Sequence, residues 1–153
     1  MRGIHFEIPN KYGRQLYDLL GKLPIENWHW RIGGEESYII EEGTLGRDLF
    51  PTVCVLDSHA FLKIISEEDY YLIFTDLKAF PSYASVKEVA TYQEFLECDC
   101  QFVLLLVDSC YVTIYAKQDD VIRQLHKQAH EKNYKNIEYI TDDNDARTRL
   151  ITF

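Results

Sequence analysis

The segment 140–150, ITDDNDARTRL, carries the densest group of side chains that could do chemistry in this 153-residue sequence. Three aspartates, Asp142, Asp143 and Asp145, are followed closely by Arg147. Carboxylates placed after a strand can bind a divalent cation or act as a general base, and an arginine can clamp an anion. These four residues are therefore a candidate functional cluster. The alternative is a polar turn held by Asp–Arg ion pairs, and the spacing lacks the glycine and terminal glutamate of an EF-hand loop.

A second set of side chains has the ligand types of a zinc site. Cys98 and Cys100 lie close in sequence, and His126 and His130 share one face of a predicted helix. Structural cysteine pairs are normally separated by two to four residues, whereas only one residue separates this pair. We therefore expect no structural zinc and no other cofactor. The alternative is a pair of buried thiols and a solvated helix face.

Signatures of other enzyme classes do not occur in the sequence. The glycines at 33–34 and at 43 and 46 lack the spacing of a phosphate-binding loop. No GxSxG motif is present to form the nucleophile elbow of a hydrolase. Whether the protein is an enzyme therefore stays open.

The chain is acidic, with 16 Lys+Arg against 25 Asp+Glu and a formal net charge of −9. This balance argues against non-specific binding to nucleic acid, which depends on neutralising phosphates with basic side chains. A basic protein partner suits the charge better. Glu67, Glu68 and Asp69 form a candidate partner-binding acidic patch, and the alternative is a solvated turn.

The sequence predicts a cytoplasmic protein that does not contact a membrane. The longest apolar run, 102–107, is too short to cross a bilayer. The first ten residues contain no apolar stretch of signal-peptide length. Four cysteines in a chain of this size do not suggest a disulfide scaffold, so we expect reduced thiols. Nothing in the sequence determines the oligomeric state.

These side chains need a scaffold, and the hydrophobic pattern predicts a single α+β domain over 1–153. The run 102–107 is apolar on both faces, which is typical of a central strand covered on both sides. A turn leads to the strand 111–117, in which Tyr111 and Tyr115 lie on the wetter face. We expect a mainly antiparallel sheet with this central two-sided apolar strand and three to four helices packed on it.

Helical signals occur in four segments. The clearest is 119–133, which opens with two aspartates and places four apolar residues on one face, namely Val121, Ile122, Leu125 and Ala129. In 11–23, Tyr12 begins an apolar stripe that continues through four leucines, and Asn10 can cap the helix. Shorter helices are predicted at 59–65, capped by Asp57 or Ser58, and at 91–98, capped by Thr91 with Glu94 as the capping-box partner.

The two tryptophans belong to a predicted strand. Trp28, Trp30 and Ile32 alternate with polar residues, which favours sheet packing over a ligand cage. The glycines at 33–34 suit a type I′ hairpin turn, which would set Arg31 opposite Glu36. Further strands are predicted at 2–8, 52–57, 70–77 and 136–141, and 41–51 is predicted to be a loop with at most one helical turn.

Several side chains in the second half of the chain carry a family resemblance. They are Tyr92, Phe95, Leu96, Cys100, Asp108, Ile114, Tyr115, Lys117 and the run 144–148. On these residues the chain resembles a family of small, functionally uncharacterised proteins of Firmicute (Bacillus-type) bacteria, and the resemblance extends to the N-terminal strand and helix. The resemblance implies a stand-alone cytosolic bacterial protein, and it implies no activity.

The function is unknown at this stage, and two classes remain. The first is a soluble acidic protein-binding module, immunity-like or regulatory and without catalysis, which contacts a basic protein. Its many tyrosines favour this class, because tyrosine anchors interfaces. The second is a small metal-assisted enzyme that uses Asp142, Asp143 and Asp145.

Overall fold

The computed structural model describes residues 1–50, 52 and 54–152, with the backbone but not the side chains of residues 34 and 35. The strands are β1 (Gly3–Glu7), β2 (His29–Glu41), β3 (Thr44–Asp48), β4 (Cys54–Asp57), β5 (Tyr70–Phe80), β6 (Phe102–Val107), β7 (Tyr111–Ala116) and β8 (Lys135–Ile140). The helices are α1 (Gln15–Leu20), α2 (Ser58–Glu67), α3 (Tyr92–Glu97) and α4 (Asp119–Glu131), with one 3₁₀ turn, η1 (Tyr83–Ser85).

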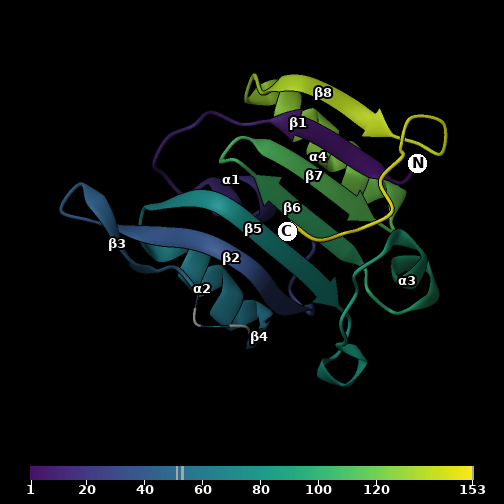
Figure 1. The fold of residues 1–153 in the computed structure, drawn as a ribbon, viewed down its shortest axis with the longest axis horizontal. Coiled ribbons are helices and arrows are strands. Elements are labelled where there is room, and N and C mark those ends of the chain that lie inside the picture. The colour runs from purple at the N-terminus through teal and green to yellow at the C-terminus, as the bar shows by residue number, and fades with distance from the viewer. Residues whose placement is uncertain (51, 53, 153) are drawn as a thin grey trace.

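All eight described strands belong to one sheet, in the spatial order β3-β2-β5-β6-β7-β1-β8. The short strand β4 pairs with β2 along the same edge as β3. Every pairing is antiparallel. The first strand, β1, lies between β7 and β8, which come from the last third of the chain (Figure 1). The predicted α+β class with a large antiparallel sheet is therefore confirmed.

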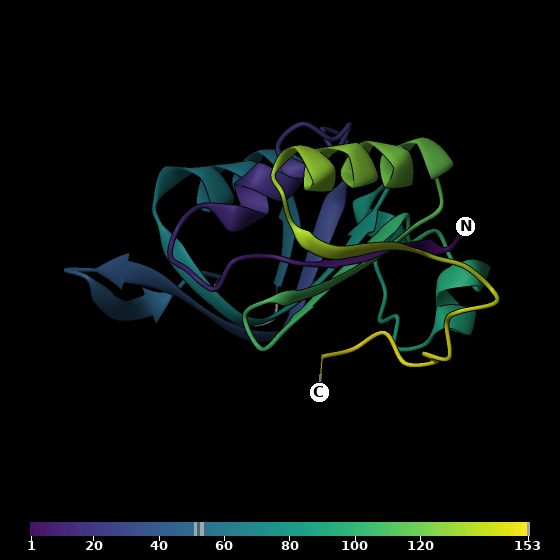
Figure 2. The same cartoon turned by 90° about the horizontal axis from the view of Figure 1, so that it is seen from above.

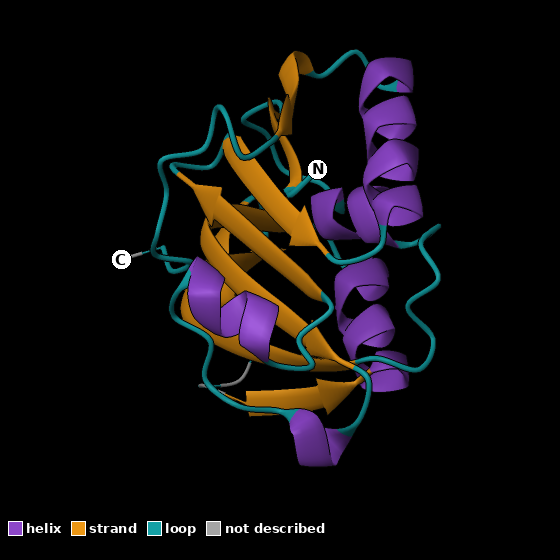
Figure 3. Ribbon diagram, turned by 90° about the vertical axis from the view of Figure 1, so that its right-hand side faces the viewer, coloured by secondary structure: helices purple, strands orange, loops and turns teal. Residues whose placement is uncertain are grey.

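The two faces of the sheet are covered differently. Helices α1, α2 and α4 cover one face, and α3 and the C-terminal segment lie against the other (Figures 2 and 3). The larger hydrophobic core lies under the three helices and includes Trp30, Phe61 and Phe102. A smaller core on the opposite face includes Phe95 and Leu150. Strand β6 supplies alternate side chains to the two cores, so it is buried from both sides along most of its length.

The hairpin predicted at 33–34 is wrong. Strand β2 runs through this point without a turn and pairs with β5, so Arg31 lies opposite Lys78 and not opposite Glu36. The register of the pairing shifts between Gly33 and Glu36. The glycines therefore mark an irregularity inside a long strand, a place where glycine is often found.

The backbone geometry of a type I′ turn occurs instead between β6 and β7. Asp108 and Ser109 have φ values of 50° and 67°, and the Cys110 N–H donates to the Val107 carbonyl over 3.3 Å. Two successive positive φ angles are what a type I′ turn requires, and three residues connect Val107 with its partner Tyr111. The predicted turn at this place is confirmed, although its residues are not glycine.

Three further predictions differ from the structure. The helix predicted over 11–23 is only α1, and Asn10 does not cap it, because its side-chain oxygen accepts a hydrogen bond from the Tyr71 hydroxyl. The predicted loop 41–51 contains strand β3. Tyr115 is fully buried and not on a wetter face. Pro51 and Val53, which belong to the predicted loop and strand, lie outside the described residues.

The helices with strong local signals are confirmed. All four predicted core residues of α4 are buried. The Asp57 side chain caps α2 by accepting from the Ala60 N–H over 2.8 Å, and the Thr91 side chain caps α3 by accepting from the Glu94 N–H. Trp30 packs in the core with its ring stacked on Phe61 at 4.2 Å between centroids, as sheet packing predicts.

Candidate functional site

The aspartates of the candidate cluster lie on the segment that follows β8, and they are tied to the other end of the chain. The Arg2 guanidinium lies 2.7 Å from the Asp142 carboxylate through Nε, and 3.4 Å from the Asp145 carboxylate through a terminal nitrogen. The hydrogen bond and charge of Arg2 lower the pKa of Asp142, and the same bond raises the pKa of Arg2. The predicted Asp–Arg pairing therefore exists, but Arg2 and not Arg147 supplies it.

Asp145 has its carboxylate occupied by groups of the protein itself. One oxygen accepts from the Tyr115 hydroxyl over 2.9 Å, and the other accepts from the backbone N–H of Arg147 over 3.1 Å. The Asp145 side chain is 9% exposed, and the Tyr115 side chain below it is fully buried. Burial, and then the bond to Asp145, raise the pKa of Tyr115. These contacts are those of a structural anchor.

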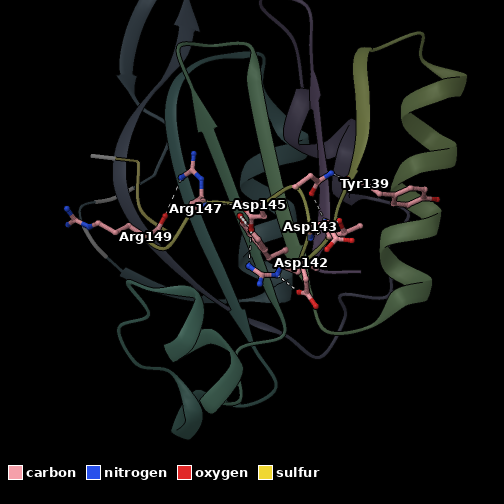
Figure 4. Close-up of polar contacts among 10 residues, drawn as sticks. Tyr139, Asp142, Asp143, Asp145, Arg147 and Arg149 are labelled. Atoms are coloured by element: carbon pink, nitrogen blue, oxygen red, sulfur yellow. Dashed lines mark hydrogen bonds and ion pairs between the residues drawn. The ribbon is translucent and has the colours of Figure 1, made fainter.

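The three carboxylates do not converge on one point (Figure 4). Asp143 is exposed and its N–H donates to the Thr141 hydroxyl, as in a polar turn. The Arg147 side chain points away from the aspartates and donates a 3.4 Å hydrogen bond to the Arg149 carbonyl. Within the described ranges, no three His, Cys, Asp or Glu side chains are grouped as metal ligands.

A cavity of about 480 Å³ adjoins this cluster. It lies between the start of α3 and the C-terminal segment, and its walls include Arg2, Tyr92, Asp145 and Arg147. The Arg2 guanidinium stacks on the Tyr92 ring at 4.2 Å from the centroid. Arg2 therefore makes two kinds of contact at this cluster. It pairs with the carboxylates, and its guanidinium covers an aromatic ring.

The acidic patch lies where α2 ends and β5 begins, and each of its carboxylates has a basic neighbour. The distances are 3.9 Å for Lys63–Glu67, 2.8 Å for Arg47–Glu68 and 3.4 Å for Arg14–Asp69. All six side chains are well exposed. Exposed pairs of this kind contribute about 0–1 kcal/mol each, so a partner could replace them at little cost.

A groove of about 580 Å³ was not identified from the sequence, and its wall residue Tyr71 lies two positions after Asp69 of the acidic patch. Its walls are Asn10, Lys11, Tyr12, Leu45 and Tyr71. Tyr12 is 50% exposed and Leu45 is 48% exposed, while the Tyr12 and Tyr71 rings meet edge to face at 5.6 Å between centroids. The sequence signal was misleading, because Tyr12 fitted the helical stripe of the leucines that follow it.

A buried ion pair in β5 was also missed. The Lys78 ammonium lies 2.6 Å from the Asp76 carboxylate and donates to the Leu150 carbonyl over 2.5 Å. The side chains are 3% and 7% exposed. Burial raises the pKa of Asp76, and the charge of Lys78 opposes that rise. The pair links the C-terminal segment to the sheet. In the sequence it shows as an acid and a base two positions apart in an otherwise apolar strand.

The comparisons with known proteins agree with the resemblance seen in the sequence. A family model described as "Protein of unknown function (DUF2691)" matches residues 1–151. The chain belongs to this family. The "Uncharacterized protein YncE" of Bacillus subtilis (strain 168) is 38% identical over 149 residues, which cover 97% of each chain. No solved structure matches. The function of this DUF2691 protein is unknown, as the sequence analysis concluded.

The cysteine and histidine pairs of the DUF2691 protein lie on opposite faces of its sheet. Cys98 and Cys100 belong to the smaller core, and burial raises the pKa of Cys100 to about 12. His126 and His130 lie on α4, which packs on the larger core. The four side chains therefore cannot form one zinc site.

Among the helices of the described chain, none has the length and apolarity needed to cross a membrane.

Proposed function

We propose that this single-domain protein is a binding module that contacts a basic protein through the Tyr12–Leu45–Tyr71 groove and the acidic patch beside it. The observation that carries the proposal is the exposure of Tyr12 and Leu45, each about half open to solvent in the walls of one groove. Large apolar side chains that line a groove are typical of interfaces, where tyrosine is enriched among the residues that dominate binding.

Charge supports a basic partner. The chain carries a net charge of −9. In the acidic patch, Asp69 lies two positions before Tyr71, which lines the groove. Glu68 pairs with Arg47, which lies two positions after the groove residue Leu45. Complementary charge mainly accelerates association and selects the partner, while the apolar contact supplies most of the affinity. The proposal includes a cytoplasmic setting, which is favoured because four cysteines in a chain of this size do not suggest a disulfide scaffold.

Shape supports the same surface. The β2–β3 hairpin extends beyond the layer of helices and carries Leu45 near its tip (Figure 2). Arg47 of this hairpin contacts both Glu41 and Glu68, so the hairpin is held against the acidic patch. A projecting element held in place loses little conformational freedom on binding, which favours affinity.

A metal-assisted enzyme at Asp142, Asp143 and Asp145 has less support. A catalytic cation needs carboxylate oxygens that converge and are free to bind it. Here Arg2 holds Asp142, and Asp145 accepts from Tyr115 and from a backbone N–H. A cation would have to displace these contacts before it could bind.

The proposal is tested by affinity capture from a Bacillus subtilis lysate, which is suitable because that organism carries the 38% identical relative. We expect a basic protein to bind the wild type in a salt-sensitive manner and to be lost with Tyr12→Ser/Leu45→Ser. Tyr83→Ser is the matched control, since Tyr83 is exposed but lies outside the groove. Equal capture by the wild type and the groove variant, or a captured partner that is acidic, would contradict the proposal.

A further inference from the structure

His126 and His130 form a pair on the face of α4 that borders β8, where His126 is half-buried and His130 is exposed. They are four residues apart, and their ring centroids lie 4.5 Å from each other at an interplanar angle of 60°. Residues at this spacing share one face of a helix. Two imidazoles so close together resemble the two nitrogen ligands of a metal chelate.

The orientation of His126 is fixed by the sheet. Its ring stacks on Tyr139 of β8, with centroids 4.4 Å apart and planes inclined by 6°. Neutral imidazole is the form that binds metals. The stacking also means that little side-chain freedom remains to be lost when a metal binds.

The separation of the rings is compatible with one shared metal ion. With a metal about 2.0–2.1 Å from each nitrogen, each ring centroid lies about 3.2 Å from the metal. Two rings that share such a metal at adjacent positions have centroids about 4.5 Å apart, and the observed separation is 4.5 Å. Among the divalent ions of this series, nitrogen ligands bind Cu²⁺ most tightly.

We propose that His126 and His130 bind one divalent transition-metal ion, with a preference for Cu²⁺ over Ni²⁺ and Zn²⁺. The two imidazoles occupy adjacent positions of the ion, and water or an external ligand occupies the others. The site is exchangeable and differs from the structural zinc site considered for the cysteines, because folding of α4 does not depend on it. It is also independent of the groove at Tyr12 and Leu45.

The test is calorimetric titration of tag-free protein with Cu²⁺, Ni²⁺ and Zn²⁺ in turn, with NMR spectra of the imidazoles recorded in parallel. We expect one equivalent of Cu²⁺ to bind saturably and to broaden the resonances of both histidines first. His126→Gln and His130→Gln should each weaken binding by roughly tenfold or more, because a single imidazole remains. His59→Gln is the matched control, since His59 is an exposed helical histidine outside the pair.

Each outcome decides the proposal. Wild-type affinity in either His126→Gln or His130→Gln, or absence of saturable binding, would overturn the site. Tighter binding of Zn²⁺ than of Cu²⁺ would overturn the proposed metal preference. Circular dichroism of the metal-free variants should match that of the wild type and exclude misfolding as the cause.

Discussion

Replacing Lys78 with methionine would leave the Asp76 carboxylate buried without its cation. Breaking a buried ion pair on one side typically costs about 3–5 kcal/mol, and the exposures of 3% and 7% place this pair in that class. The substitution also removes the hydrogen bond to the Leu150 carbonyl. For a domain of this size we expect the free energy of unfolding to fall by roughly 3–5 kcal/mol and the melting midpoint by roughly 6–20 °C.

Urea unfolding at pH 7 and pH 5 measures both the size of the loss and its origin. Burial raises the pKa of Asp76, so a folded protein without Lys78 can protonate this carboxyl as the pH falls. A raised folded-state pKa contributes stability that is present at low pH and is lost as the pH rises through it. The cost of Lys78→Met should therefore be smaller at pH 5 than at pH 7.

Two further variants show whether the buried charge is the cause. Asp76→Leu/Lys78→Met removes both charges and should recover most of the loss, except the part due to the unpaired Leu150 carbonyl. Lys63→Met, which breaks the exposed pair with Glu67, should cost only about 0–1 kcal/mol. If Lys78→Met costs no more than Lys63→Met, or if the double variant is less stable than Lys78→Met alone, the reasoning is refuted.

Three other predictions follow from the site and the core. Asp145→Ala should lower the free energy of unfolding by about 1–3 kcal/mol, because it leaves the buried Tyr115 hydroxyl unpaired; unchanged urea unfolding would contradict the anchoring role. His126 should titrate by NMR with a midpoint below its ordinary value of about 6.5, and His130→Gln should raise the midpoint only in part, since burial is the larger cause. The lowered pKa also means that the contribution of His126 to stability is lost as the pH falls below 6.5. In His126→Gln, the free energy of unfolding should therefore fall less over the same pH range. Leu104→Ala should cost about 2–5 kcal/mol in chemical unfolding, and a cost below 1 kcal/mol would show that β6 is not packed on this side.

The helix α4 could be predicted from the sequence because its signal is local. Val121 and Ile122 repeat along one face with Leu125 and Ala129, and the acidic start suits a helix N-terminus. The caps at Asp57 and Thr91 could be predicted for the same reason, since a cap depends on residues only three positions away.

The hairpin at 33–34 was mispredicted because glycine allows a turn without requiring one. Whether the chain turns there is decided by β5, which pairs with β2 on both sides of Gly33. Strand β3 was missed because most of its residues are exposed, which leaves no alternation to detect. Conversely, Asp108 and Ser109 adopt positive φ in a turn that has no glycine.

The candidate cluster could be found from the sequence, but its contacts could not. Arg2 reaches Asp142 from 140 residues away, and no local pattern identifies that partner. The pairing of β1 with β8 brings the two ends of the chain together. The groove at Tyr12 depends in the same way on Leu45 and Tyr71, which come from two other strands.

The position of β1 has a consequence for synthesis of the protein on the ribosome. Ile4 and Phe6 belong to the core, but the strands on either side of β1 begin only at Tyr111 and Lys135. At about 5–20 residues per second, roughly 5–20 s separate the synthesis of β1 from that of its first partner. During this time an apolar strand stays unpaired in the nascent chain. We therefore expect the sheet to close late, after nearly the whole chain has emerged, and a nascent chain stalled before β7 to expose β1 to chaperones.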